Sequence, residues 1–172
     1  MPDERESRKE RKRQSLLAAA YGLFTEKGVA KTSVDEIVRR ANVAKRTFYL
    51  YFQDKDQLLQ QLVYDISARV LEEAYAWLEE RRTPDFVENV LLILDYIIEY
   101  FKRNKLVLRL VERNFSWPMV ARQMSERSDP LWDRLMSDLE RSPQASRYSE
   151  EKLFRIIFVI VEMVGSVCYS SI

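Results

Sequence analysis

The sequence predicts an all-α fold, and three observations carry this prediction. Glycine and proline are scarce, with 3 and 5 residues in a chain of 172, well below their share of about 12% in average proteins. Apolar residues recur at spacings of three and four, as they do on one face of a helix. No segment alternates apolar and polar residues in the way that a half-buried strand does.

The charge is divided unevenly along the chain, and this division predicts two domains. Residues 1–55 hold 13 Lys and Arg against 8 Asp and Glu, a net charge of +5, whereas residues 56–172 hold 15 against 19, a net charge of −4. A small basic module for a polyanion, joined to a larger module with another task, would give this pattern. On charge alone, a solvated helix face explains it more simply. We place the domain boundary between residues 55 and 56.

The first domain is expected to begin with two helices. Apolar residues from Ser7 to Lys27 follow one helical face, and Gly28 then supplies the left-handed conformation that ends a helix. Ser33 and Glu36 have the spacing of a capping box, which opens a second, short helix. Asn42 tolerates a positive φ better than most residues, so a tight turn is expected there.

A third short helix is expected from Lys45 to about Phe52, and its two faces differ in chemistry. At about 100° per residue, an aromatic group points to one side: Phe48, Tyr51 and Phe52. A second group points to the other side: Lys45, Arg46, Tyr49 and Leu50. Two short helices joined by a tight turn and braced by a longer helix are the parts of a three-helix helix-turn-helix domain.

The outer face of the third helix offers groups that recognise DNA. The guanidinium of Arg46 can donate two hydrogen bonds to guanine, and Leu50 can contact a thymine methyl group. Lys45 and Lys55 can neutralise phosphate charge. The hydroxyl of Tyr49 can donate to a phosphate oxygen. This pattern favours binding in the major groove.

A set of residues between Leu16 and Leu59 is specific in its order and spacing: Ala19, Leu23, Phe24, Gly28, Thr32, Ser33, Val34, Ile37, Ala41, Thr47, Phe48, Tyr49, Phe52, Lys55 and Leu58. Together they resemble the DNA-binding domain of the tetracycline-repressor (TetR) family of bacterial regulators. The resemblance implies which residues face DNA: Thr32, Ser33, Lys45, Arg46, Thr47, Tyr49 and Lys55. Ala44 departs from the family pattern, because a serine or threonine often caps the recognition helix there; the missing cap weakens the helix start by about 1 kcal/mol.

The second domain is expected to be helical throughout. Helices are predicted over residues 54–81, 85–103, 106–114, 131–139 and 150–172. Pro84, Pro118 and Pro130 are read as punctuation between them. The helix over 85–103 has only a narrow charged stripe, so we expect it to be central. The last helix is apolar around most of its circumference and needs burial on several sides.

The resemblance also implies a task for this larger helical domain, namely ligand binding and dimerisation. We expect a homodimer that binds a near-palindromic double-stranded DNA operator and acts as a repressor that an unknown small-molecule effector releases. Leu153 to Val167 is expected to form the dimer interface. Candidates for the effector pocket are Trp77, Phe86, Tyr96, Tyr100, Trp117, Met124, Trp132, Phe158 and Glu162. At helical spacing, such side chains are more often simple core.

The sequence excludes several classes of site. It has no histidine and a single cysteine, Cys168, which excludes His-based triads, His metal sites, intrachain disulfides and thiolate clusters. We therefore expect no metal, no cofactor and no enzyme. The apolar run from Ile156 to Ile172 is shorter than a membrane span, and a cytoplasmic location is expected. The alternative is a helical protein-interaction or ligand-carrier module without DNA binding. In that case the basic segment Arg8 to Arg13 is a solvated terminus, whereas a regulator would place it along the DNA backbone or in a minor groove.

Overall fold

The computed structural model describes residues 4–112, 114–127 and 129–171, and all regular structure in them is helical. The helices are α1 (Glu4–Lys27), α2 (Val34–Arg40), α3 (Lys45–Tyr49), α4 (Lys55–Glu79), α5 (Phe86–Arg103), α6 (Lys105–Glu112), α7 (Trp117–Glu126), α8 (Pro130–Arg141) and α9 (Glu150–Ser171). The all-α prediction is confirmed. The chain forms two compact units, residues 1–63 (unit 1) and 64–172 (unit 2), and their division falls inside α4.

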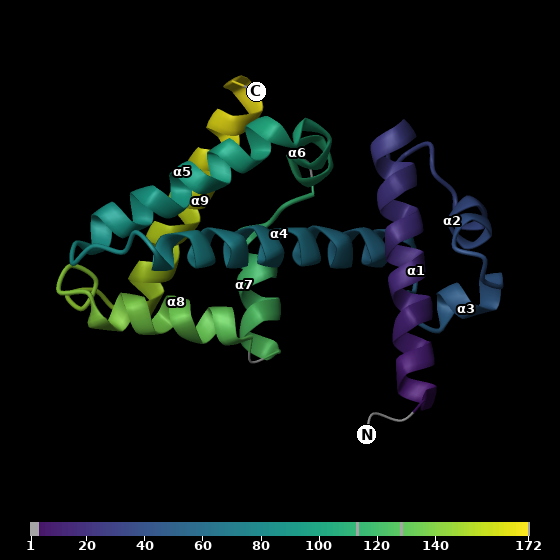
Figure 1. Cartoon of the computed structure of the whole chain (residues 1–172), viewed down its shortest axis with the longest axis horizontal. Helices are drawn as coiled ribbons and strands as arrows, with labels where there is room; N and C mark the ends of the chain where they lie inside the picture. The colour runs from purple at the N-terminus through teal and green to yellow at the C-terminus, as the bar shows by residue number, and fades with distance from the viewer. Residues whose placement is uncertain (1–3, 113, 128, 172) are drawn as a thin grey trace. The chain divides into compact units, whose positions relative to one another are not determined.

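Unit 1 consists of three helices and the first turns of α4. α1 lies against both α2 and α3, and α2 lies against α3 (Figure 1). Its core contains side chains with no exposed surface: Leu16, Ala20, Ile37, Phe48 and Leu58. Leu16 and Ala20 are one helical turn apart, so α1 presents a continuous apolar ridge to the shorter helices.

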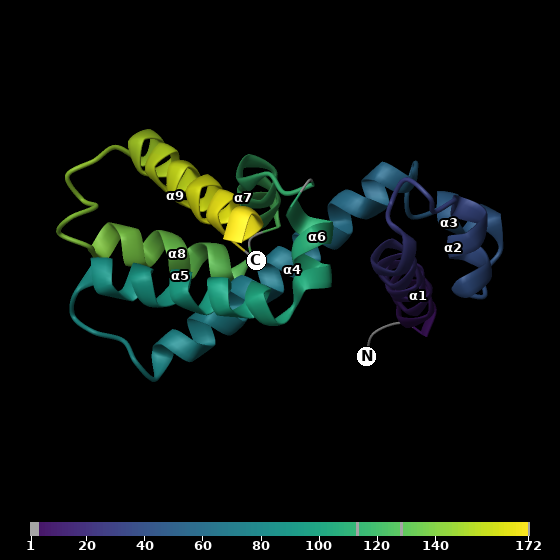
Figure 2. The same cartoon turned by 90° about the horizontal axis from the view of Figure 1, so that it is seen from above.

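In unit 2, α5 contacts α9, and both helices contact α6; Figures 1 and 2 show these helices from two directions. The expectation that α5 is central is wrong. Among its residues only Asn89 is buried, while the side chains of Val87 and Leu91 are 50% and 57% exposed. Part of the apolar surface of α5 lines cavities and part faces solvent.

One helix is missed by the sequence. α7 begins next to Pro118, which the sequence pattern treats only as a break. A proline in the first turn of a helix costs little, because its missing N–H would have no partner there. Pro130 opens α8 in the same way, and the Asp129 side chain caps that helix by accepting from the Leu131 N–H at 2.9 Å.

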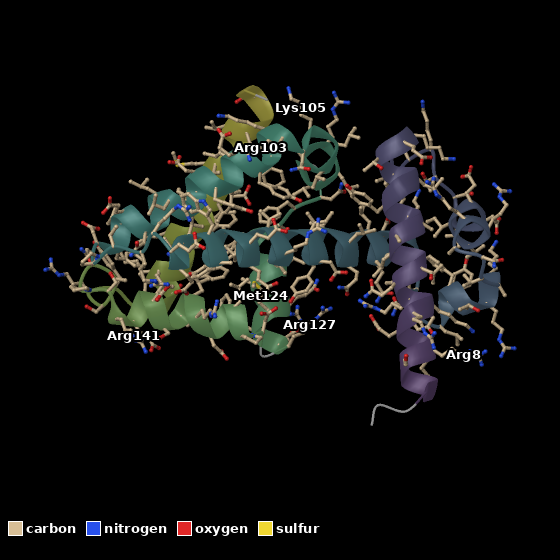
Figure 3. The ribbon with its side chains drawn as sticks, in the orientation of Figure 1. Arg8, Arg103, Lys105, Met124, Arg127 and Arg141 are labelled. Carbon is tan, nitrogen blue, oxygen red and sulfur yellow. The ribbon has the colours of Figure 1, made fainter. Side chains whose placement is uncertain are left out.

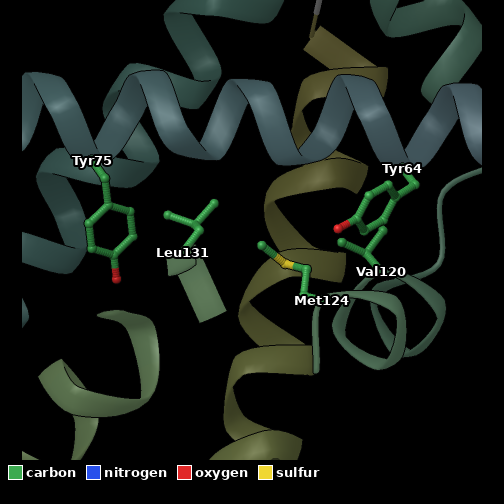
Figure 4. Packing of buried hydrophobic residues seen from close by; sticks show 5 residues of the cluster. All are labelled: Tyr64, Tyr75, Val120, Met124 and Leu131. Atoms are coloured by element: carbon green, nitrogen blue, oxygen red, sulfur yellow. The ribbon is translucent and has the colours of Figure 1, made fainter. Parts of the chain in front are cut away.

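The core of unit 2 joins α4, α7 and α8. Met124 on α7, labelled in Figure 3, has no exposed surface. It packs with Val120 of the same helix, with Tyr64 and Tyr75 of α4, and with Leu131 of α8 (Figure 4). The Tyr64 hydroxyl also lies 3.1 Å from a carboxylate oxygen of Asp129. Asp129 precedes α8, so this hydrogen bond ties the start of that helix to α4.

Candidate functional site

The capping box predicted at the start of α2 is confirmed. The Ser33 hydroxyl oxygen accepts from the Glu36 N–H at 3.3 Å, and the Glu36 carboxylate accepts from the Ser33 N–H at 2.9 Å. The other oxygen of this carboxylate pairs with Lys27 at the end of α1. The hydrogen bond from Lys27, and then those from Ser33, lower the pKa of Glu36 to about 2. The cap therefore also fastens α2 to α1.

Two residues with positive φ lie in the connections on either side of α2. Gly28 has φ 86° and ends α1, as predicted. Asn42 has φ 54° and forms the turn between α2 and α3. Its N–H donates to the Arg39 carbonyl at 3.2 Å, and the next N–H, of Val43, donates to the Val38 carbonyl at 3.0 Å. These bonds satisfy carbonyls at the end of α2 that the helix itself leaves open.

The sequence predicts the third helix as far as about Phe52, but α3 ends at Tyr49, with Leu50 as its C-cap, and Tyr51 is only half-buried. The remaining residues lie on the two faces that the sequence predicts. Phe48 is fully buried and Phe52 is 4% exposed, with their ring centroids 5.7 Å apart. On the opposite face, Tyr49 is 53% exposed and Leu50 is 71% exposed, and Arg46 is exposed as well. No other described residue forms a hydrogen bond or ion pair with the Arg46 guanidinium. This guanidinium is therefore available to an external acceptor.

Ion pairs that the sequence did not single out hold α2 in place. The Arg40 guanidinium donates two hydrogen bonds to the Glu26 carboxylate of α1, at 2.8 and 2.6 Å. Gly22 leaves room for this guanidinium, since a Cβ at that position would lie 2.9 Å from its nitrogen. Lys45 of α3 lies 2.9 Å from a carboxylate oxygen of Asp35 on α2, and this hydrogen bond raises the pKa of Lys45. Only spatial proximity could have revealed these partners, which lie 10 to 14 positions apart in the sequence.

Two of the residues expected to face DNA are used inside unit 1. Thr32 is 2% exposed, and its hydroxyl donates to the Gly28 carbonyl at 2.9 Å. The half-buried Lys55 ammonium donates to the carbonyls of Val29 and Thr32, at 2.8 and 2.9 Å. Together these bonds tie the loop between α1 and α2 to the start of α4. Ser33 is exposed and Thr47 is half-buried. DNA contact by any of these residues stays a prediction.

Unit 2 contains two neighbouring cavities. The first, the inner cavity, has a volume of about 120 Å³ and is lined from α4, α5, α6, α7 and α9. The second, the outer cavity, has a volume of about 490 Å³ and extends to the loop between α8 and α9. The two share five lining residues: Leu71, Leu94, Ile97, Trp117 and Val161. Because they share walls on four helices, they are adjacent compartments of one region.

The structure brings only part of the predicted pocket together. Trp117 lines both cavities and Phe86 lines the outer one. The other candidates lie elsewhere among the described residues: Trp77, Tyr96, Tyr100, Met124, Trp132, Phe158 and Glu162. Met124 belongs to the core, Trp132 packs against that core, and Glu162 is exposed.

Contacts with neighbouring side chains, and not with a cavity, position three of the remaining aromatic candidates. The Trp77 ring lies 5.9 Å from that of Tyr96, whose hydroxyl is 3.2 Å from a carboxylate oxygen of Glu73. The Tyr100 hydroxyl accepts from Arg69 at 3.4 Å. These side chains form a layer between α4 and α5. The other residues that line the inner cavity were not predicted from the sequence. Cys168 is one of them, and burial raises the pKa of its thiol.

The part of the chain that the structure describes holds no group of three or more His, Cys, Asp or Glu side chains placed to bind a metal ion. Within the same ranges, every helix is too short or too polar to cross a membrane.

Comparison with known proteins relates the chain to one family. Residues 16–62 match the family model described as bacterial regulatory proteins, tetR family. These residues include the second half of α1, all of α2 and α3, and the start of α4. The chain is 33% identical over 95 residues to the uncharacterized HTH-type transcriptional regulator YdgC of Bacillus subtilis, covering 54% of this chain and 49% of YdgC. It is 24% identical over 156 residues to the HTH-type transcriptional regulator AcrR of Shigella flexneri, covering 87% and 72%. The matched regions span about half of the first curated relatives, with 53% of YhgD of B. subtilis as a further example.

Solved structures show the same fold. A TetR-family transcriptional regulator from Streptomyces coelicolor superposes with a TM-score of 0.64 at 22% identity, covering 92% of this chain and 81% of that one. A TetR family transcription regulator from Marinobacter aquaeolei superposes with a TM-score of 0.59 at 21% identity, covering 96% and 87%. The order of helices and the match over α1 to α3 agree with the residue pattern found in the sequence. Residues 16–62 therefore resemble the DNA-binding region of the TetR family of bacterial regulatory proteins, and the chain shares its fold with solved members of that family.

Proposed function

We propose that this chain binds double-stranded DNA in a sequence-specific manner and regulates transcription, and that it catalyses no reaction. The two-sided α3 carries this proposal. Phe48 and Phe52 hold the helix from behind, while Arg46, Tyr49 and Leu50 are exposed on the other side. A recognition helix in the major groove needs this division. A regulator of this kind works where the chromosome is, so we place it in the cytoplasm.

Each exposed group has a role that fits its chemistry. Arg46 reads guanine through two parallel hydrogen bonds, and Leu50 contacts a thymine methyl group. Tyr49, Ser33 and Lys45 contact the phosphate backbone, with Thr47 beside them. Lys45 must exchange Asp35 for phosphate, an exchange between two exposed anionic partners. We assign Thr32 and Lys55 a positioning role, because their bonds hold the loop that precedes α2.

We propose further that the chain works as a homodimer on a near-palindromic operator. α9 carries a stripe of exposed apolar side chains: Ile156, Val159, Met163 and Val167. Their spacings of three and four residues place them on one face of the helix. Two copies can pair such faces around a two-fold axis, and the operator then mirrors that symmetry.

The cavities of unit 2 support the proposal of a small-molecule effector. A bound molecule would contact four of the helices at once, so it could favour one arrangement of them over another. It changes DNA affinity only if it binds the two arrangements differently. We propose the direction usual in the TetR family, in which the effector releases a repressor.

The test of DNA recognition is selection of duplexes from a random pool, followed by fluorescence anisotropy with the selected duplex. Arg46→Ala should cost about 1–3 kcal/mol of binding free energy and relax the preference at one base pair. Arg109→Ala, which removes the same charge from an exposed position on α6, is the matched control and should bind as the wild type.

Two results would count against the proposal in different ways. Unchanged binding by Arg46→Ala would show that α3 does not read the bases in the assigned manner. No enrichment from the pool at low salt would favour the protein-interaction or ligand-carrier alternative over a regulator.

A further inference from the structure

We infer that the inner cavity takes a small, uncharged and mostly apolar molecule with one hydrogen-bond acceptor, which meets the indole N–H of Trp117. This inference names the chemical class of the proposed effector. Only the regulatory consequence rests on the proposed function. The binding itself rests on the cavity.

The lining of the inner cavity excludes charged ligands. None of the described residues that line it is charged, and its polar side chains are Ser67, Trp117 and Cys168. The ammonium of Lys102, which acts electrostatically on the Cys168 thiol, pairs with Glu99 at 2.7 Å and is exposed. A carboxylate or an ammonium would lose its hydration here without gaining a counter-charge, and that loss is prohibitive.

Trp117 adds a specific polar requirement to this apolar wall. The residue is 5% exposed, and its Nε1–H has no hydrogen-bond partner among the described residues. Buried polar groups in proteins are nearly always paired, so an unpaired donor on a residue that lines a cavity is unusual. An acceptor on a ligand would satisfy it, whereas a hydrocarbon would leave it open. The thiol of Cys168 is only a weak donor and cannot replace it.

The volume limits the size of the ligand. The inner cavity holds about 120 Å³, and an apolar cavity of about 150 Å³ is enough for benzene. The inner cavity is therefore no larger than a single ring needs, and any substituent on the ring must extend beyond it. The walls shared with the outer cavity, at Leu94 and Val161 for instance, let a substituent extend in that direction.

Three probes of similar shape test the inference on the full chain without DNA. Acetophenone, α-methylstyrene and benzoate have the same number of non-hydrogen atoms, but carry a carbonyl acceptor, no acceptor and a negative charge respectively. The chain has 3 tryptophans, so the three indole N–H signals of ¹⁵N-labelled protein can be followed by NMR. Acetophenone should shift the Trp117 signal and bind about tenfold more tightly than α-methylstyrene, the factor expected when a buried donor gains its acceptor. Benzoate should leave all three signals in place.

Two variants identify the donor and assign the signals. Trp117→Phe keeps an aromatic ring but removes the N–H, so the two neutral probes should bind with equal affinity. Trp77→Phe is the matched control, because Trp77 lines neither cavity, and it should keep the tenfold preference. If Trp117→Phe does not fold, the wild-type spectra still decide the question.

Three outcomes would overturn the inference. These are binding of benzoate as tight as that of acetophenone, a preference for acetophenone that survives in Trp117→Phe, and a shift confined to the Trp77 or Trp132 signals. Failure of the proposed function is distinguishable from these. A protein that binds acetophenone through Trp117 but enriches no DNA sequence has the cavity and is not a DNA-binding regulator.

Discussion

Units 1 and 2 differ in how far their apolar side chains are buried and in how far their polar groups have hydrogen-bond partners. In unit 1, most apolar side chains are buried, apart from Tyr49 and Leu50 on the outer face. Hydrogen bonds of Ser33, Asn42 and Lys55 tie the ends of its helices. In unit 2, the apolar stripe of α9 is exposed and the indole N–H of Trp117 lacks a partner among the described residues. The difference suggests different binding partners for the two units. Unit 1 buries most of its apolar surface within itself and exposes polar groups that can bind DNA. Unit 2 leaves apolar surface for a second copy and for a ligand.

The largest expected effect is a contrast between two phenylalanines. Phe48→Ala should lower the free energy of unfolding by about 3–5 kcal/mol, because it empties a fully buried site in unit 1. Phe158→Ala, at a side chain that is 37% exposed on α9, should cost much less in a dilute monomer. Denaturant titration followed by circular dichroism measures both. Equal losses would mean that α9 is as well buried as α3, against the contrast drawn above.

A charge on the exposed stripe of α9 should separate the dimer. Met163→Glu places a carboxylate where two apolar faces are proposed to meet, and it should weaken association about 100-fold. Sedimentation equilibrium measures the change. Glu162→Gln, at the neighbouring exposed position, alters the net charge by one unit as well and serves as the control. If Met163→Glu associates like the wild type, the interface lies on another surface.

The local structure of unit 1 could be predicted because its signals lie within a few residues of each other. Gly28 and Asn42 adopt positive φ, and Ser33 caps α2 with Glu36 three positions away. The bonds of Lys55 could not be predicted in this way. Its acceptors lie 26 and 23 positions earlier. The sequence alone does not distinguish a lysine that holds a loop from a lysine that contacts phosphate.

The cavities of unit 2 were harder to predict for a related reason. An apolar residue at helical spacing looks the same in sequence whether it fills a core, as Met124 does, or lines a cavity, as Trp117 does. The result depends on how several helices pack against each other. The helix α7, which carries both residues, was itself missed because Pro118 was read as a break. The family resemblance implies ligand binding by this domain, but it does not indicate which residues line a cavity.

A missing cap in unit 1 offers a smaller, stabilising test. Ala44 has φ −68° and ψ 146°, the backbone of an N-cap, but provides no side-chain hydrogen bond to α3. Ala44→Ser should therefore raise the free energy of unfolding by about 1 kcal/mol. Ala44→Val adds side-chain atoms without an acceptor and should not stabilise. Equal stability of the two variants in denaturant titrations would show that the start of α3 does not need a cap.

The smallest effect concerns the acid end of the pH range. The pKa of Glu36 is about 2 in the folded chain, against an ordinary value of 4.5. A carboxylate with a lowered folded pKa stabilises the protein fully above its unfolded pKa, and this contribution is lost as the pH falls from about 4.5 to about 2. In that window, the free energy of unfolding of Glu36→Gln should fall less steeply than that of the wild type.

Glu140→Gln, at an exposed position of α8, is the control and should follow the wild-type slope. Other carboxylates keep part of the slope in every variant, since hydrogen bonds from Arg40 and Lys102 lower the pKa of Glu26 and of Glu99. The comparison is therefore between slopes, not between absolute stabilities. Glu36→Gln and the wild type could instead lose stability in parallel. The contacts of Glu36 with Lys27 and Ser33 would then not stabilise the packing of α2 against α1 in solution.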